Sequence, residues 1–294
     1  MIATSRVRAS PRLLLAKLLA MARKRTPKRP DLSSSWAKLD RADWHLDCLN
    51  AEYRKYEATL RNAGDGSAPP TVATREPDLR TGTVWVVVRL GAVPAPPRRL
   101  GLMVGDAIHN TRSALDHLLC SLVRSGGRKG CSTENQFPVS IHEVFPEDNR
   151  LDGVPTWARD LILGMQPYAD RTLERSKLLL RLADFDNADK HRSLHPLIQP
   201  TIKRIPLGAT AVEGAEVPVP GVRIYSSHAQ ADSLFREGAE LWRMRLPDLD
   251  MIRTVEVQVD FGVLFGAPPV SIPGIRDMVL NVRSIVRRFD VDPP

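Results

Sequence analysis

Short polar side chains crowd one arc of a predicted helix that includes residues 105–117. At about 100° per residue, this arc carries seven polar residues: Asp106, His109, Asn110, Arg112, Ser113, Asp116 and His117. The opposite arc is apolar or small: Ala107, Ile108, Thr111, Ala114, Leu115 and Leu118. Solvated helix faces favour Lys, Glu and Gln, because Asp, Asn, Ser and His are neutral to unfavourable in helices. Since imidazole and carboxylate groups transfer protons and guanidinium groups bind phosphate, we expect acid–base chemistry or a buried polar network here.

A second polar cluster ends a predicted helix that begins near Leu173. Leu178, Leu182 and Phe185 form the apolar stripe of this helix, and Asp189 takes the next position on that stripe. If the helix persists, Asp189 points toward the bundle. A buried carboxylate is costly unless it is paired, so we expect a cationic partner.

The first polar arc offers that partner as Arg112 or His117. Residues 186–192 add further short polar groups, among them Asn187 and His191. We therefore predict that the segments 105–117 and 186–192 meet in space.

Metal and cofactor chemistry have weaker support in the sequence. His191 and His195 are four residues apart, which on a helix places both imidazoles on one face near Asp189. Pro196 follows directly and indicates that the helix is ending. No third ligand has a clear spacing, and the glycine patterns of phosphate and dinucleotide loops are absent. We predict no metal site and no cofactor.

Three ordered motifs carry a resemblance to a known group of proteins. They are Gly-Asp-x-Ile-His-Asn-x-Arg-Ser-Ala-Leu-Asp-His at 105–117, Gln-Pro-Tyr at 166–168 and Asp-Asn-x-Asp-Lys-His-Arg at 186–192. With them the chain resembles a group of uncharacterised bacterial and phage proteins over most of its length after the N-terminal tail. That group brings no established activity with it.

A second resemblance carries more chemistry. Arg112 and His117 fit the Arg-x4-His pattern of the HEPN superfamily, helical proteins that include metal-independent ribonucleases. The resemblance implies that His117 performs acid–base attack by the RNA 2′-hydroxyl and that Arg112 stabilises the charged phosphorane. Ser113 departs from the larger polar residue usual in that superfamily, and the long β region is not part of its basic helical bundle.

Helix geometry adds a subunit partner to this hypothesis. On an ideal helix, Arg112 and His117 are about 140° apart, so they converge across a subunit interface or through local distortion. HEPN nucleases often build their sites by dimerisation, which implies a homodimer with RNA as substrate. The candidate catalytic residues are then Arg112 and His117. The supporting polar network consists of Asp106, His109, Asn110, Asp116, Asn187, Asp189 and His191.

The same residues also suit functions without catalysis. Networks of Asp, Asn, Arg and His commonly lock helices in one register and need no substrate. A non-catalytic ligand-binding or structural protein is therefore the alternative to a ribonuclease. The accessibility of His117 separates the two, because a structural histidine is sealed and a catalytic one lines a cleft.

Hydrophobic periodicity places these residues in an α+β fold. Helices are predicted over 35–63, 100–123, 157–165, 173–190 and 272–289, a strand over 83–90, and a β region over 197–263. The strict alternation of residues 255–261 predicts a strand with one buried and one wet face. We expect a bundle of about five helices packed with a mainly antiparallel sheet, in one domain over residues 31–294.

Charge and composition set the remaining limits. The chain has 294 residues and a net charge of +8, but nine of its 42 basic residues lie in residues 1–30, which hold no acid. We expect this tail to be disordered, and Met21 is an alternative start. The remaining 33 basic and 34 acidic residues nearly cancel, so the body shows no nucleic-acid surface by charge. Three unpatterned cysteines and no membrane-length apolar stretch predict reduced thiols and a cytoplasmic location.

Overall fold

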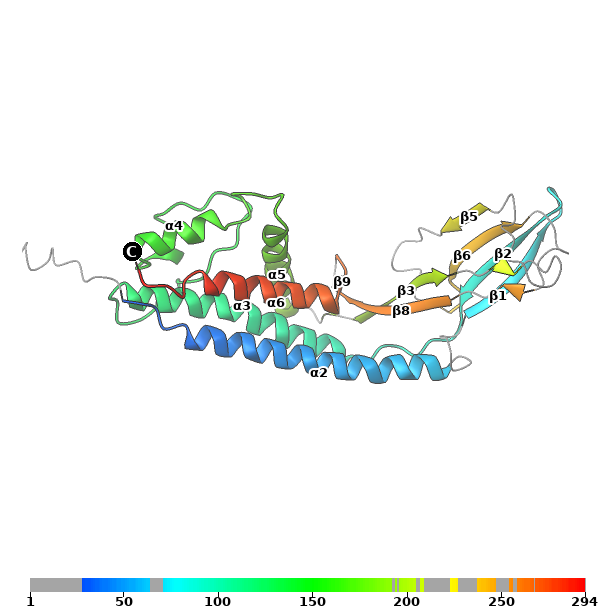
Figure 1. Cartoon of the computed structure of the whole chain (residues 1–294), viewed down its shortest axis with the longest axis horizontal. Coiled ribbons are helices and arrows are strands. Elements are labelled where there is room, and N and C mark those ends of the chain that lie inside the picture. The colour runs from blue at the N-terminus through cyan, green and yellow to red at the C-terminus, as the bar shows by residue number, and fades with distance from the viewer. Residues whose placement is uncertain are drawn as a thin grey trace, which may run out of the picture. The chain divides into compact units, whose positions relative to one another are not determined.

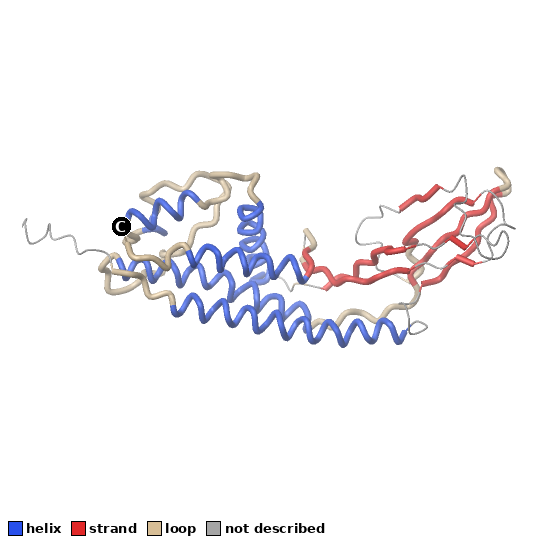
Figure 2. The backbone as a smooth tube through the Cα atoms, viewed as in Figure 1, coloured by secondary structure: helices blue, strands red, loops and turns tan. Residues whose placement is uncertain are grey.

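The computed structural model describes residues 28–63, 71–191, 194, 196–204, 207–208, 223–226, 237–246, 254–255, 258–266 and 268–293. Over these residues the chain forms five α-helices and nine β-strands (Figures 1 and 2). All strand pairings among them are antiparallel, so the predicted α+β class is confirmed. Tail residues 1–27, with Met21, lie outside the described residues, as do parts of the β region expected over 197–263, among them residues 209–222.

The chain divides into two compact units. Unit 1 comprises Met1–Ala37, Ser113–Leu180 and Val282–Pro294, and unit 2 comprises Lys38–Arg112 and Arg181–Asn281. Most of the predicted polar site belongs to unit 2, whereas Asp116 and His117 belong to unit 1. The assignment of residues 31–294 to one domain stays a prediction.

The helices begin and end within two residues of their predicted bounds. They are α2 (Ser33–Ala63), α3 (Arg99–Ser125), α4 (Thr156–Gly164), α5 (Glu174–His191) and α6 (Ile272–Arg287). Their apolar stripes are buried as the periodicity requires. In α3, for example, every member of the predicted apolar arc is fully buried. None of the described helices is long and apolar enough to cross a membrane.

Within unit 2, α2 runs antiparallel to the first half of α3, and three polar contacts join them. The contacts are Lys38 with Asn110, His45 with Asp106, and Glu52 with Arg99. The three α2 members are seven residues apart, which is about two helical turns. They therefore lie along one line of α2, beside its buried leucines.

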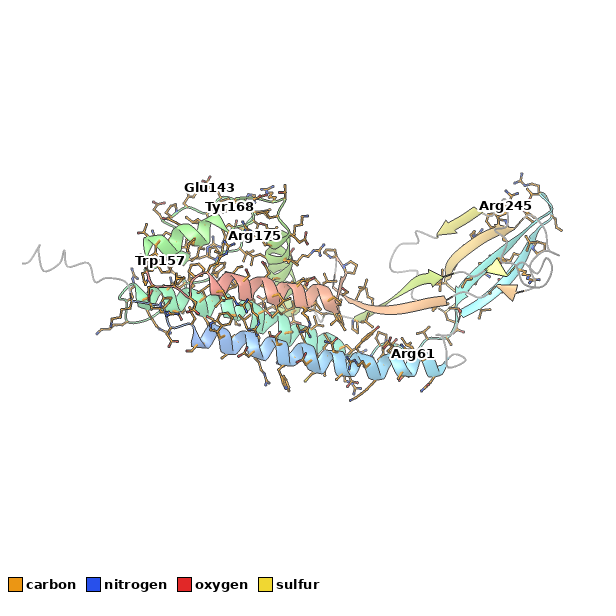
Figure 3. All side chains as sticks on the ribbon, in the orientation of Figure 1. Arg61, Glu143, Trp157, Tyr168, Arg175 and Arg245 are labelled. Atoms are coloured by element: carbon orange, nitrogen blue, oxygen red, sulfur yellow. A yellow bond between two sulfur atoms is a disulfide. The ribbon has the colours of Figure 1, made fainter. Side chains whose placement is uncertain are left out.

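Unit 2 also holds the strands. A four-stranded sheet has the order β1 (Thr71–Asp78), β2 (Thr83–Leu90), β6 (Glu240–Leu246), β5 (Arg223–Ser226). A three-stranded sheet has the order β3 (Pro196–Arg204), β8 (Gln258–Phe265), β9 (Val270–Ser271). A two-stranded sheet pairs β4 (Leu207–Gly208) with β7 (Thr254–Val255). Strand β2 has the predicted bounds. Strand β2 also carries Trp85, and the guanidinium groups of Arg243 and Arg245 lie over its ring. Figure 3 labels Arg245 in this sheet.

The predicted alternating strand at residues 255–261 differs from the structure. Strand β7 ends at Val255, β8 begins at Gln258 and continues to Phe265, and residues 256–257 lie outside the described part. Within β8, buried Val263 and Phe265 alternate with half-buried Gly262 and Leu264.

Two cysteines correct the expectation of reduced thiols. Cys120, near the end of α3, forms a disulfide with Cys131 in unit 1, across Cα atoms 5.2 Å apart. Cys48 is free. Spacing alone could not identify the pair, since pairing depends on how the chain folds back after α3. Because disulfides persist mainly in oxidising compartments, the cysteines no longer support a cytoplasmic location.

Unit 1 also holds the end of the predicted disordered tail. The backbone amide of Lys28 donates to the Ser125 carbonyl at 3.2 Å, and Arg29 forms a 2.8 Å ion pair with Asp290. Pro30 is buried. The packed part of unit 1 therefore includes Lys28, Arg29 and Pro30, which the sequence analysis placed in the tail.

Candidate functional site

The polar arc of α3 is partly exposed. The side chains of Asp106 and His109 are 62% and 58% exposed. Asn110 and Arg112 are half-buried. Because the apolar arc behind them is fully buried, α3 is held in place while Asp106 and His109 stay accessible.

Helix α5 brings a buried carboxylate to this arc. Asp186 is only 4% exposed, and its Oδ1 lies 3.7 Å from Nδ1 of His109. Its Oδ2 accepts a 2.6 Å hydrogen bond from the Lys190 ammonium, one turn further along α5. The segments 105–117 and 186–192 therefore meet within unit 2, as their composition suggested.

Asp189 approaches α3 at a glycine. A Cβ at Gly105 would overlap the Asp189 carboxylate, so a larger residue there would require the Asp189 side chain to move. One turn earlier, a Cβ on Gly101 would overlap the backbone carbonyl of Leu194. The two glycines form the surface against which the end of α5 and the following segment pack.

The surroundings of Asp189 favour its protonated form. Burial raises the pKa of the Asp189 carboxyl, and the negative charges of Asp106 and Asp186 raise it further. His109 acts in the opposite direction and lowers this pKa. The sequence suggested Arg112 or His117 as the partner of Asp189, whereas the residue that lowers the pKa of Asp189 is His109.

A second histidine–carboxylate pair comes from α2, which the sequence analysis did not include in the site. Nδ1 of His45 lies 3.6 Å from Oδ2 of Asp106, and the His45 side chain is only 10% exposed. Burial lowers the pKa of His45, an effect that the Asp106 charge opposes. His45 lies three residues after Ala42 and four before Leu49, both fully buried. A histidine within this apolar stripe was the feature of the sequence that could have indicated a role for His45.

The remaining predicted residues have mixed positions. The Asn110 amide donates to the Asp106 backbone carbonyl at 2.8 Å, and its Oδ1 accepts from Lys38 at 3.4 Å. Asn187 is exposed on α5. His191 is the last residue of α5, and its side chain lies outside the described residues.

In unit 1, Asp116 anchors a loop. Its Oδ1 accepts a 2.9 Å hydrogen bond from the backbone amide of Phe137. His117 is half-buried on the same helix. Its accessibility therefore does not separate a structural from a catalytic histidine. Arg112 and His117 belong to different units.

A metal centre receives no geometric support from the described residues. Among them, no group of three or more His, Cys, Asp or Glu side chains is arranged to hold a metal ion. The pair His191 and His195 cannot be compared with this result, because His195 and the His191 side chain lie outside the described part of the chain.

Unit 2 brings two histidines and three carboxyl groups together along α2, α3 and α5. A carboxylate next to Nδ1 of a histidine holds the proton on that nitrogen and leaves Nε2 as the base. Asp186 and His109 approach this relation: the buried carboxylate oxygen lies 3.7 Å from Nδ1 of the exposed imidazole, within ion-pair distance but beyond hydrogen-bond distance. Asp189 adds a carboxyl group whose pKa is raised by burial and by the charges of Asp106 and Asp186. No protein-family model, curated protein or solved structure matches the chain.

Proposed function

We propose that the α3–α5 cluster cleaves RNA by metal-independent acid–base chemistry. The observation that carries this proposal is the 3.7 Å pair between the buried Asp186 carboxylate and the exposed His109 imidazole. Arg112 lies three residues after His109 and so on the same side of α3. A base and a phosphate-binding guanidinium thus share one surface of the helix.

The proposed reaction uses three side chains. His109 takes the proton of the 2′-hydroxyl, the 2′-oxygen bonds to phosphorus, and the bond from phosphorus to the 5′-oxygen breaks. The Asp189 carboxyl gives its proton to that leaving oxygen, which its raised pKa favours. Arg112 stabilises the added negative charge on the phosphorane. The products are a 2′,3′-cyclic phosphate and a 5′-hydroxyl end.

The assignment of His109 revises the pair expected from the HEPN resemblance. His109 has a buried carboxylate beside Nδ1 and an exposed ring, which are the properties of a general base. The Arg112–His117 arrangement, completed across a homodimer, stays a prediction of the resemblance. Both assignments use Arg112, so only substitution of the histidines separates them.

The experiment is cleavage of end-labelled RNA by the full chain in excess EDTA. We expect His109→Ala and Asp189→Asn to lower the rate at least about a hundredfold, the usual contribution of a proton-transfer group. His142→Ala, in an exposed loop of unit 1, is the matched control and should leave the rate unchanged. Loss in His117→Ala with full activity in His109→Ala would instead favour the HEPN assignment. Absence of cleavage by the parent protein would refute the ribonuclease.

A second candidate function is a non-catalytic polar lock between elements. The observation that favours it is the hydrogen bond that the Phe137 amide donates to Asp116, by which a motif residue holds a loop. In that case, Asp116→Asn and Asp186→Asn lower the melting temperature, and RNA is neither bound nor cut. Thermal unfolding of the same variants therefore accompanies the cleavage assay.

A further inference from the structure

An apolar groove in unit 2 lies apart from the residues of the proposed ribonuclease site. It has a volume of about 490 Å³, and its walls are the connector Leu90–Pro96, the start of β3 at Pro196 and Leu197, and Glu237. Sites for small organic ligands usually span roughly 300 to 1,000 Å³ and are lined mainly by apolar groups. The groove has both properties.

Hydrogen bonds hold the groove walls in place. The Tyr56 hydroxyl donates to the Pro94 carbonyl at 2.6 Å. The Leu90 amide donates to the Ala239 carbonyl at 2.9 Å, and the Gly238 amide donates to the Leu90 carbonyl at 2.8 Å. Gly238 has a φ of 83°, a backbone conformation that glycine adopts readily. It lies in the turn that also contains Glu237. Because proline fixes its own φ, the connector is also stiff, and the groove is preformed.

The groove has one charged lining residue, Glu237. Within the described part of the chain, its exposed carboxylate has no hydrogen-bond or ion-pair partner. An apolar groove with a single carboxylate is complementary to an apolar molecule that carries one positive charge. Three prolines among the lining residues offer flat hydrocarbon surfaces to a ring.

We propose that this groove is a binding site for a small arylalkyl ammonium ligand. The ring packs on the proline surfaces, and the ammonium group pairs with Glu237. The binding energy comes mainly from burial of the apolar part, and the charge sets the preference for a cation. This proposal does not depend on RNA cleavage.

The test compares two probes of equal shape, 4-phenylbutylammonium and 4-phenylbutan-1-ol. Titration calorimetry with the full chain at low salt measures both, because salt screens an exposed pair. We expect a dissociation constant for the cation of about 1 mM, typical for a ligand of this size. The cation should bind about fivefold more tightly than the alcohol, the upper range for a partly exposed ion pair.

Three variants locate the binding. Glu237→Gln should remove the preference for the cation, and Glu134→Gln, an exposed glutamate in unit 1, should keep it. Ala92→Trp, on an exposed lining position, should block both probes. Equal affinity for the two probes, a preference that survives Glu237→Gln, unchanged binding in Ala92→Trp, or no binding at all would each overturn the proposal.

Discussion

Gly105 shows how one residue fixes the position of the candidate acid. A methyl group at this position would overlap the Asp189 carboxylate. We expect Gly105→Ala to lower the free energy of unfolding by about 1–3 kcal/mol, as overpacking does. Urea unfolding followed by tryptophan fluorescence measures the change.

Gly164 provides the matched control for this substitution. It ends α4, and a Cβ built there meets nothing within 4 Å. Gly164→Ala should therefore be neutral or stabilise the protein by up to about 1 kcal/mol. Adding Asp189→Ala to Gly105→Ala should recover part of the lost stability, because the two side chains would no longer overlap. Equal losses in the two glycine variants, or no recovery, would contradict the proposed contact.

Asp189 should make stability depend on pH in a defined direction. Burial, Asp106 and Asp186 raise its pKa in the folded protein. A carboxyl with a raised folded pKa stabilises the protein below its unfolded pKa, and that contribution is lost as pH rises through the folded pKa. Asp189→Asn should therefore raise the free energy of unfolding above that of the parent protein. The gain should be larger at about pH 7 than at about pH 3.5. Denaturant unfolding at both pH values measures the difference.

Asp170→Asn is the control with the opposite sign. The Thr172 side chain and backbone hydrogen-bond to Asp170 and lower its pKa. Its contribution to stability is present above the unfolded pKa and is lost as pH falls through the folded pKa. Asp170→Asn should thus destabilise the protein at about pH 7 and do so less at about pH 3.5. The same direction in both variants would show that Asp189 does not have a raised pKa.

Individual site residues were predictable to different degrees. The pattern of short polar residues identified Asp106, His109 and Asp189, because side-chain type and helical position are both written in the sequence. It did not identify His45, whose role depends on which face of α2 lies against α3. The choice between His109 and His117 likewise required the position of Asp186, a contact between separate helices.

At the scale of elements, periodicity predicted the helices and β2, and it missed β1. The β1 segment Thr71–Asp78 contains Glu76, Pro77 and Asp78, which are rare in strands. It is an edge strand with no buried residue, so little apolar pattern marks it. Its pairing with β2, whose buried residues supply the hydrophobic face, makes it a strand.

The disulfide provides a prediction at the same scale. Cys120–Cys131 closes a loop of 11 residues after α3. A cross-link over a loop of this length stabilises a protein by about 2–3 kcal/mol in the chain-entropy account. We expect Cys131→Ser to lower the melting temperature, whereas Cys48→Ser should change it little, because Cys48 is free.

A thiol titration checks the pairing directly. Under denaturing conditions without reductant, the parent protein should show one reactive thiol, since two of its three cysteines are paired. After reduction it should show three. Three thiols before reduction would refute the disulfide, and the sequence expectation of reduced cysteines would then stand.

At the scale of the whole molecule, the basic residues are unevenly distributed, so under the proposed function RNA attraction and RNA cleavage belong to different segments. Residues 1–27 contain seven Arg or Lys residues, whereas the rest of the chain is nearly neutral. Replacing these seven by Gln in the full chain should weaken single-stranded RNA binding, because fewer phosphate counterions are released. If all seven contact phosphate, the slope of log affinity against log salt should fall by up to about 5.

Cleavage at saturating RNA should stay unchanged, because His109 and Asp189 lie outside the altered segment. Loss of cleavage at saturation, with the fold intact by circular dichroism, would place catalytic groups in the tail and contradict the α3–α5 site.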